Sequence, residues 1–173
     1  KLRTSIFKSL GQVDWAKLTH TGKLTLARAY QIALIRLGEA DAEVKGRIVK
    51  HLDPHFPAPN FEQNWLLCET LAYLQAPSTA AKGIKLLQEA ATQEEQIEYA
   101  RSLRMLKAGW TLELRTAYFE WFLKAANYRG GASFSKFIEF IRRDAEASLD
   151  TQSREQLKEL LAKKPVQKSP FEV

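Results

Sequence analysis

The only residues spaced like metal ligands lie between His51 and His55, where two imidazoles flank the carboxylate of Asp53. Histidine and carboxylate side chains are common ligands of zinc and other first-row metals. A helix would bring residues four apart to one face, but Pro54 interrupts the helix between the two histidines. No third strong ligand follows nearby, so the sequence favours a loop over a metal site. We expect no bound metal.

Three other places carry residue types used in catalysis or cofactor binding, and none has the required pattern. Gly22-Lys23 lacks the earlier glycine and the following Ser or Thr of a phosphate loop. Cys68 lies in an apolar run, where a cysteine is usually a small core residue. Glu94 and Glu95 point about 100° apart on a helix and cannot act together across a bond. We therefore expect no catalytic residue, no cofactor and no enzymatic activity.

Arginines around a double-glycine turn form the one candidate interaction patch. Arg129 precedes Gly130 and Gly131, and Arg142 and Arg143 follow in the next expected helix. Guanidinium groups bind carboxylates and other anions in paired hydrogen bonds. The alternative is that the two glycines only let the chain reverse and that the flanking arginines are solvated.

The positive charge lies mainly in the first third of the chain. The 173 residues have a net charge of +6, and residues 1–51 hold ten Lys or Arg against four Asp or Glu. Such a segment suits nucleic acid, an anionic membrane or an acidic domain. A solvated surface explains it as well, because the basic residues are interleaved with core positions. No apolar run approaches the about 20 residues that span a bilayer, and a lone cysteine excludes an internal disulfide.

Apolar residues recur three and four positions apart, and capping residues, glycines or prolines separate the runs. Thr92-Gln93-Glu94-Glu95 has the pattern of a capping box, and Asp41, Asn60, Thr111, Ser133 and Thr151 stand at other expected helix starts. We predict short helical pieces over 1–10 and 13–18, then helices over 23–37, 42–52, 61–75, 79–91, 93–108 and 112–126, one from 133, and a last short one between 151 and 165. No segment has the alternation of a strand.

The predicted fold is all-α, a HEAT/armadillo-like α-α superhelix of about eight to ten helices. Helix starts near Lys23, Phe61 and Gln93 recur at intervals close to the periods of helical repeats. A closed helical bundle is the alternative, because it uses the same helices. We expect one domain over 1–163 and a linker over 164–173 toward a missing C-terminal domain, since the chain lacks an initial methionine and reads as a piece of a longer protein.

A family resemblance covers about residues 50–150. It is carried by Phe56-Pro57-Ala58-Pro59, Asn64-Trp65-Leu66-Leu67-Cys68, Tyr73-Leu74-Gln75-Ala76-Pro77, Thr92-Gln93-Glu94-Glu95-Gln96-Ile97, Gly109-Trp110-Thr111, Tyr118-Phe119-Glu120-Trp121-Phe122, Tyr128-Arg129-Gly130-Gly131, Ser133-Phe134 and Ile141-Arg142-Arg143. This string resembles the HEAT-like helical region of large exported bacterial proteins. In them a sugar-dehydrogenase-like β-propeller commonly precedes this region and a c-type cytochrome domain follows it.

The resemblance implies a scaffold in an exported or periplasmic protein, whose parent chain would be a haem- or quinone-linked oxidoreductase. The haem-attachment motif C-x-x-C-H is absent from the sequence, so no haem is carried over to this chain. The leading hypothesis is a non-catalytic scaffold or interaction module that contacts neighbouring domains or another protein. The alternative is a HEAT-like nucleic-acid-binding domain, similar to alkylpurine DNA glycosylases, that uses the basic first third.

Overall fold

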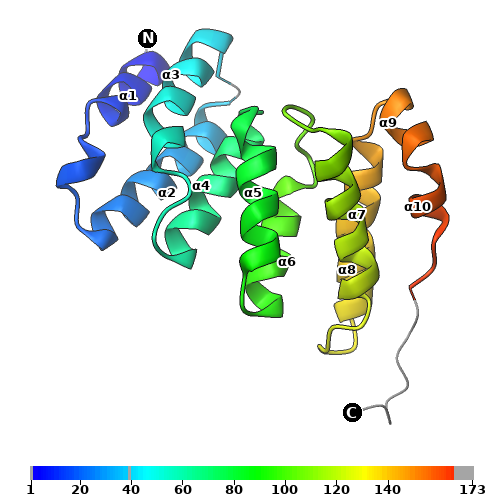
Figure 1. Cartoon of the computed structure of the whole chain (residues 1–173). Coiled ribbons are helices and arrows are strands. Elements are labelled where there is room, and N and C mark those ends of the chain that lie inside the picture. The colour runs from blue at the N-terminus through cyan, green and yellow to red at the C-terminus, as the bar shows by residue number, and fades with distance from the viewer. Residues whose placement is uncertain (1, 39, 166–173) are drawn as a thin grey trace. The chain divides into compact units, whose positions relative to one another are not determined.

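The computed structural model describes residues 2–38 and 40–165, which form α-helices joined by short turns and contain no strand (Figure 1). The predicted all-α class is therefore confirmed for the described part of the chain. The helices are α1 (Leu2–Gly11), α2 (His20–Leu37), α3 (Ala42–Leu52), α4 (Phe61–Tyr73), α5 (Ser78–Glu89), α6 (Gln93–Leu103), α7 (Leu112–Ala125), α8 (Phe134–Ala147), α9 (Thr151–Gln156) and α10 (Lys158–Ala162). The choice between a superhelix and a closed bundle stays a prediction.

Side-chain caps fix most of the helix starts that the sequence predicts. The side-chain oxygens of Asp41, Asn60, Thr92 and Thr111 each accept a hydrogen bond from the backbone amide three residues later, at 2.9–3.3 Å. A capping bond of this kind satisfies one of the amide groups that a helix start leaves without a partner. Polar residues at these positions therefore set the helix boundaries locally.

Several predicted ends differ from the structure, for local reasons. α2 begins three residues before the predicted 23, because the Thr19 side chain caps it. α6 ends at Leu103 and not at 108. Ser133 makes no side-chain capping bond. The last predicted helix is divided at Leu157 into α9 and α10, and Asp150 caps it in place of Thr151.

The chain divides into two compact units, residues 1–79 and 80–173. The division falls in the first turn of α5. Two contact units are compatible with one repeat domain, so the domain over 1–163 stays a prediction. Most of the predicted linker, residues 166–173, lies outside the described residues.

In the first unit, α2 packs against both α1 and α4 and buries Leu26, Tyr30 and Leu34. α1 and α3 lie side by side and run in the same direction. An ion pair of 3.8 Å joins Arg3 and Asp41 where both helices start, and His51 Nε2 lies 3.0 Å from the Val13 carbonyl oxygen where both end. The space between these two helices is therefore fixed at each end.

The second unit packs α8 against α6 and α7 through Ile138, Ile141 and Ala145. The polar atoms of its buried aromatic side chains form hydrogen bonds within this unit. The Tyr118 hydroxyl donates to the Ala100 carbonyl oxygen at 2.6 Å, and Trp121 Nε1 donates to the Gln96 side-chain oxygen at 3.0 Å. These bonds let large aromatic side chains fill the core without leaving a buried donor unpaired.

The burial of α7 and α5 departs from helical spacing at particular residues. α7 buries Tyr118, Phe119 and Phe122, but Leu112 and Ala126, which the spacing places on a second apolar side of this helix, are exposed. Ala91, which the spacing places with the buried side of α5, is also exposed. Helical periodicity gives the angle of a residue around the helix axis, but the neighbouring helices decide how wide the buried sector is.

Tyr30 provides a test of this packing. Its side chain is 0% exposed, and its hydroxyl lies 2.7 Å from His51 Nδ1. Tyr30→Phe should lower the free energy of unfolding by about 1–2 kcal/mol, because the imidazole nitrogen loses its buried donor. Urea unfolding measures the change. The control Tyr73→Phe removes the hydroxyl of a half-exposed tyrosine and should leave the stability nearly unchanged. Equal effects in the two variants would contradict the assigned role of this hydrogen bond.

Candidate functional site

Large apolar side chains remain exposed on one side of the helix pair α2 and α4. Ile35 is 78% exposed, Ile32 53% and Tyr73 52%. Two adjoining hollows of about 310 and 520 Å³ lie beside these side chains, and both are lined by Arg28. We call the surface formed by Arg28, Ile32, Ile35, Trp65 and Tyr73 the α2–α4 face. Its residue types are those that contribute most to binding at protein interfaces.

The buried side-chain amide of Gln31 joins the two helices that form the α2–α4 face. Gln31 Nε2 lies 3.1 Å from a Glu69 carboxylate oxygen and 3.1 Å from the Thr70 hydroxyl, so it ties α2 to α4. Arg28 donates to the Gln31 side-chain oxygen at 2.8 Å, and its guanidinium lies 5.7 Å from the centre of the Trp65 ring. Cation–π stacking and hydrogen bonding therefore hold the arginine in one position.

Trp65 carries an unsatisfied donor at this face. Its Nε1–H group is buried and has no hydrogen-bond acceptor within the part of the chain that the structure describes. Buried indole N–H groups normally have an acceptor, because an unpaired donor costs free energy. The α2–α4 face therefore combines exposed apolar side chains with one buried N–H group that has no acceptor within the described residues.

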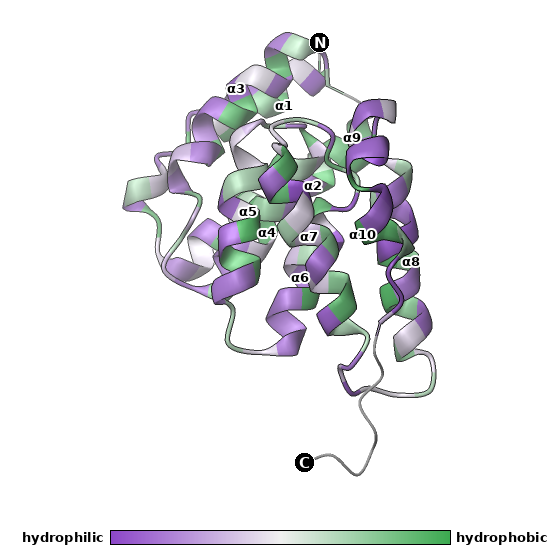
Figure 2. Cartoon of the chain, turned by 45° about the vertical axis from the view of Figure 1, so that its right-hand side comes forward, coloured by the Kyte–Doolittle hydropathy of each residue, from purple (hydrophilic) through white to green (hydrophobic). Residues whose placement is uncertain are grey.

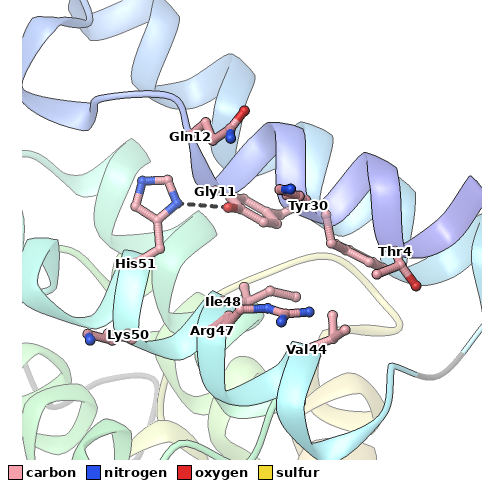
Figure 3. Close-up of a pocket in the computed structure, with 11 residues that line it drawn as sticks. Thr4, Gly11, Gln12, Tyr30, Val44, Arg47, Ile48, Lys50 and His51 are labelled. Carbon is pink, nitrogen blue, oxygen red and sulfur yellow. Dashed lines mark hydrogen bonds between the residues drawn. The ribbon is translucent and has the colours of Figure 1, made fainter.

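A third hollow, of about 500 Å³, lies between α1 and α3 (Figure 3). Its floor is formed by apolar side chains of both helices and by Tyr30 of α2, and cationic side chains line its sides. The cations are Lys8 from α1 and Arg47 and Lys50 from α3. No carboxylate is among its lining residues within the described chain. We call this hollow the α1–α3 groove.

At one end of this groove His51 forms two hydrogen bonds. Its Nδ1 is 2.7 Å from the Tyr30 hydroxyl (Figure 3), and its Nε2 is 3.0 Å from the Val13 carbonyl oxygen. The carbonyl can only accept, so Nε2 carries the hydrogen and Nδ1 accepts from the tyrosine. Burial raises the pKa of the Tyr30 hydroxyl, which keeps it protonated as the donor.

The metal-like cluster of the sequence is dispersed in the structure. His51 uses both ring nitrogens in hydrogen bonds, Asp53 accepts from the Ser78 hydroxyl, and His55 stacks on Trp15 with ring centres 5.0 Å apart. Among residues 2–38 and 40–165, no three His, Cys, Asp or Glu side chains are grouped as metal ligands. These residues instead join α3 and the turn after it to their neighbours.

The arginines of the candidate patch make different contacts in the structure. Arg142 donates to Glu146 at 2.8 Å and to the Leu161 carbonyl oxygen at 2.7 Å, so it ties α8 to α10. Arg143 points to solvent and covers the Phe140 ring at 4.9 Å. The backbone of Arg129 is bonded to the Gln93 side chain at 2.7 and 3.2 Å. The patch therefore contains one solvent-facing arginine on α8 and a fixed turn.

Exposed aromatic residues next to Arg143 were missed by the sequence reasoning. Phe140 is 52% exposed, and Phe137, which helical spacing places on the apolar side of α8 with Ile138 and Ile141, is 41% exposed. Figure 2 shows that hydrophobic and hydrophilic residues alternate along α8, and its core side is occupied by Ile138 and Ile141. We call Phe137, Phe140 and Arg143 the α8 outer face. Phe140 is an apolar residue outside the apolar stripe of α8, and this departure from the amphipathic pattern is the sequence signal that could have identified it.

Two further ionisable groups are buried for structural reasons. Cys68 is fully buried, and desolvation raises the pKa of its thiol, with Glu69 adding to the effect, so the reactive thiolate is disfavoured. Arg115 of α7 lies over the Trp110 ring at 4.9 Å, and burial lowers its pKa while Asp150 opposes the shift. The sequence predicted the buried cysteine but not the buried arginine.

Comparison with protein-family models, with curated proteins and with solved structures finds no match for this chain. None of the helices in the described residues has both the length and the apolar character needed to cross a bilayer.

The turn in the arginine patch can be tested with its two glycines. A Cβ on Gly130 would overlap the ring of Phe134, whereas a Cβ on Gly131 would meet no atom within 4 Å. Gly130→Ala should therefore lower the free energy of unfolding by about 1–3 kcal/mol, since the Phe134 ring must move. Chemical unfolding followed by circular dichroism measures the loss. Gly131→Ala is the matched control and should leave stability nearly unchanged; a neutral Gly130→Ala would show that the turn is not constrained by this contact.

The stacked His55 predicts a dependence of stability on pH. Burial lowers its pKa below the ordinary 6.5, and the neighbouring His51 and Lys23 add to the shift while Asp14 opposes it. The unfolded chain then binds a proton at higher pH than the folded chain. The free energy of unfolding should therefore fall as pH drops from about 6.5 toward the lowered pKa. His55→Phe keeps a ring on Trp15 and should remove this part of the loss, as measured by urea unfolding at about pH 7.5 and 5.5. An equal loss in both proteins would contradict the assignment.

Proposed function

We propose that this chain is a non-catalytic helical module that binds a neighbouring domain or another protein. The observation that carries the proposal is the α2–α4 face, where Ile32, Ile35 and Tyr73 are exposed beside Trp65. Scattered exposed apolar residues are normal, but adjoining ones on a rigid helix pair are typical of binding surfaces. Covering them removes apolar area from water, which stabilises a complex.

The polar groups of the α2–α4 face support the same function. Arg28 is already positioned by Gln31 and Trp65, so little side-chain entropy is lost when a partner packs on it. Trp65 adds a buried N–H group that has no acceptor within the described residues. The α8 outer face has the same composition, with Phe137 and Phe140 beside Arg143.

A scaffold role is consistent with how the polar residues of the chain are used. The candidate catalytic residues have structural partners: His51 binds Tyr30 and Val13, and Cys68 is enclosed in the core. The resemblance to the helical region of propeller–cytochrome proteins leads to the same proposal, in which the chain holds other domains in place. Under this proposal the chain has no substrate of its own.

Photo-cross-linking at position 35 tests the proposal. The photoreactive residue benzoylphenylalanine, placed at Ile35 of the full chain in the cells that make it, should form a reproducible cross-link to one protein or domain. Titration of the purified partner then measures its affinity. Ile35→Asp should weaken binding by about tenfold or more, because a charge would be buried in an apolar contact.

Leu2→Asp is the matched control, since Leu2 is an exposed apolar residue outside the face. It should leave the affinity within about twofold. The proposal fails if no partner cross-links at position 35 above the level at position 2. It also fails if the purified chain turns over a substrate and a surface substitution abolishes the turnover.

The nucleic-acid hypothesis stays a prediction. The net positive charge of residues 1–51 supports it, but ion pairs in the structure neutralise part of that charge. Three cations of the basic first third are paired with carboxylates, in Arg3–Asp41, Lys17–Asp14 and Arg47–Glu43. A gel shift with duplex DNA at low salt, weakened steeply by added salt, is the result that this hypothesis requires.

A further inference from the structure

The α1–α3 groove holds positive charge that the fold does not use. Lys8 and Lys50 line it and have no ion-pair partner within the described residues, and Arg47 pairs with exposed Glu43 at 2.5 Å. An exposed pair of this kind contributes little to stability and is readily exchanged. Three cations therefore face one hollow whose described lining holds no carboxylate, which favours an anionic ligand.

The shape of the groove favours an elongated ligand. Along α1 it is lined from Thr4 to Gly11, which corresponds to about two helical turns, and Gln12 follows just past the helix. The lining residues on each helix are mostly three or four apart, and α3 runs beside α1 in the same direction. The hollow thus follows two parallel helices over about two turns. A helix of the partner presents side chains at the same spacing and fits such a hollow.

The walls favour a peptide over a single-stranded nucleic acid. Single-stranded nucleic acid needs exposed aromatic rings on which bases stack. Phe7 and Tyr30, which are the aromatic residues that line the groove apart from His51, are only 4% and 0% exposed, so neither offers a ring face. The aliphatic stems of the lysines and of Arg47 instead provide apolar contact beside each charge, which suits a segment with alternating acidic and apolar residues.

We propose that the α1–α3 groove binds an acidic helical segment of a partner protein, whose carboxylates pair with Lys8 and Lys50 across the groove. This proposal rests on the function proposed above, since it names a second contact and the chemistry of the partner. The Tyr30–His51–Val13 hydrogen bonds hold the ends of α1 and α3, so the two lysines are presented on fixed helices.

Fluorescence anisotropy with a defined probe tests this inference. The probe is a fluorescein-labelled, alanine-based helical peptide of about 16 residues, with glutamates four apart and leucines beside them. The whole chain should bind it at about 50 mM salt, and binding should weaken at about 200 mM salt. The same peptide with glutamine in place of glutamate should bind at least about tenfold more weakly.

Lys8→Gln together with Lys50→Gln should weaken binding of the glutamate peptide by about tenfold. Both lysines are exposed and have no ion-pair partner within the described residues, so the fold should be retained, which circular dichroism checks. Lys124→Gln together with Lys163→Gln removes the same charge from exposed residues that do not line the groove, and should change the affinity less than about twofold. Loss of binding in this control pair would overturn the inference.

Other outcomes separate this inference from the proposed function. If Ile35→Asp abolishes peptide binding and the Lys8–Lys50 pair does not, the peptide uses the α2–α4 face and the groove proposal fails while the function stands. Absence of binding at low salt overturns the groove proposal alone. A single-stranded oligonucleotide that binds more tightly than the peptide, with the same dependence on Lys8 and Lys50, would overturn the choice of a peptide.

Discussion

The hydrogen bond between the buried Tyr30 hydroxyl and His51 Nδ1 is the contact on which the first unit depends. Tyr30 lies in the middle of the helix that packs against both α1 and α4, so its polar tip must find a partner inside the core. His51 provides the acceptor and donates its other N–H to Val13, which brings the end of α1 to the end of α3. One histidine thus joins three segments, and the α1–α3 groove lies between the helices that it holds.

The next residue of α2 joins this helix to α4 through hydrogen bonds. Gln31 is buried and bonds to Glu69 and Thr70, so α4 is joined to α2 by a polar contact as well as by apolar packing. Ile32 lies on the side of α2 away from Tyr30 and is exposed, whereas Ile35, four residues after Gln31, shares its side and lines a hollow beside Tyr73. The exposed apolar face therefore borders the polar contact between α2 and α4. An evenly amphipathic helix would have placed polar residues there.

At the candidate sites, the sequence identified individual residues but not their contacts. It selected Arg142 and Arg143 together, but adjacent residues on a helix point about 100° apart. Arg142 turns toward α10 and Arg143 lies over Phe140, so only one of the pair faces the solvent. His51 was considered as a metal ligand in the sequence. In the structure it accepts a hydrogen bond from Tyr30, a residue 21 positions earlier. Neither contact can be read from local spacing.

Local sequence was enough to establish the all-α class and most helix starts, because capping bonds and 3.6-residue periodicity involve residues within one or two turns of each other. Asp41, Asn60, Thr92 and Thr111 act as caps whatever their surroundings. Which apolar residues stay exposed, and which cations share a groove, depends instead on tertiary packing. Leu34 and Ile35 are both strongly hydrophobic neighbours in the sequence, yet the first is buried and the second is exposed. That difference depends on the positions of α1, α3 and α4 around α2, which are fixed by contacts between residues far apart in the chain.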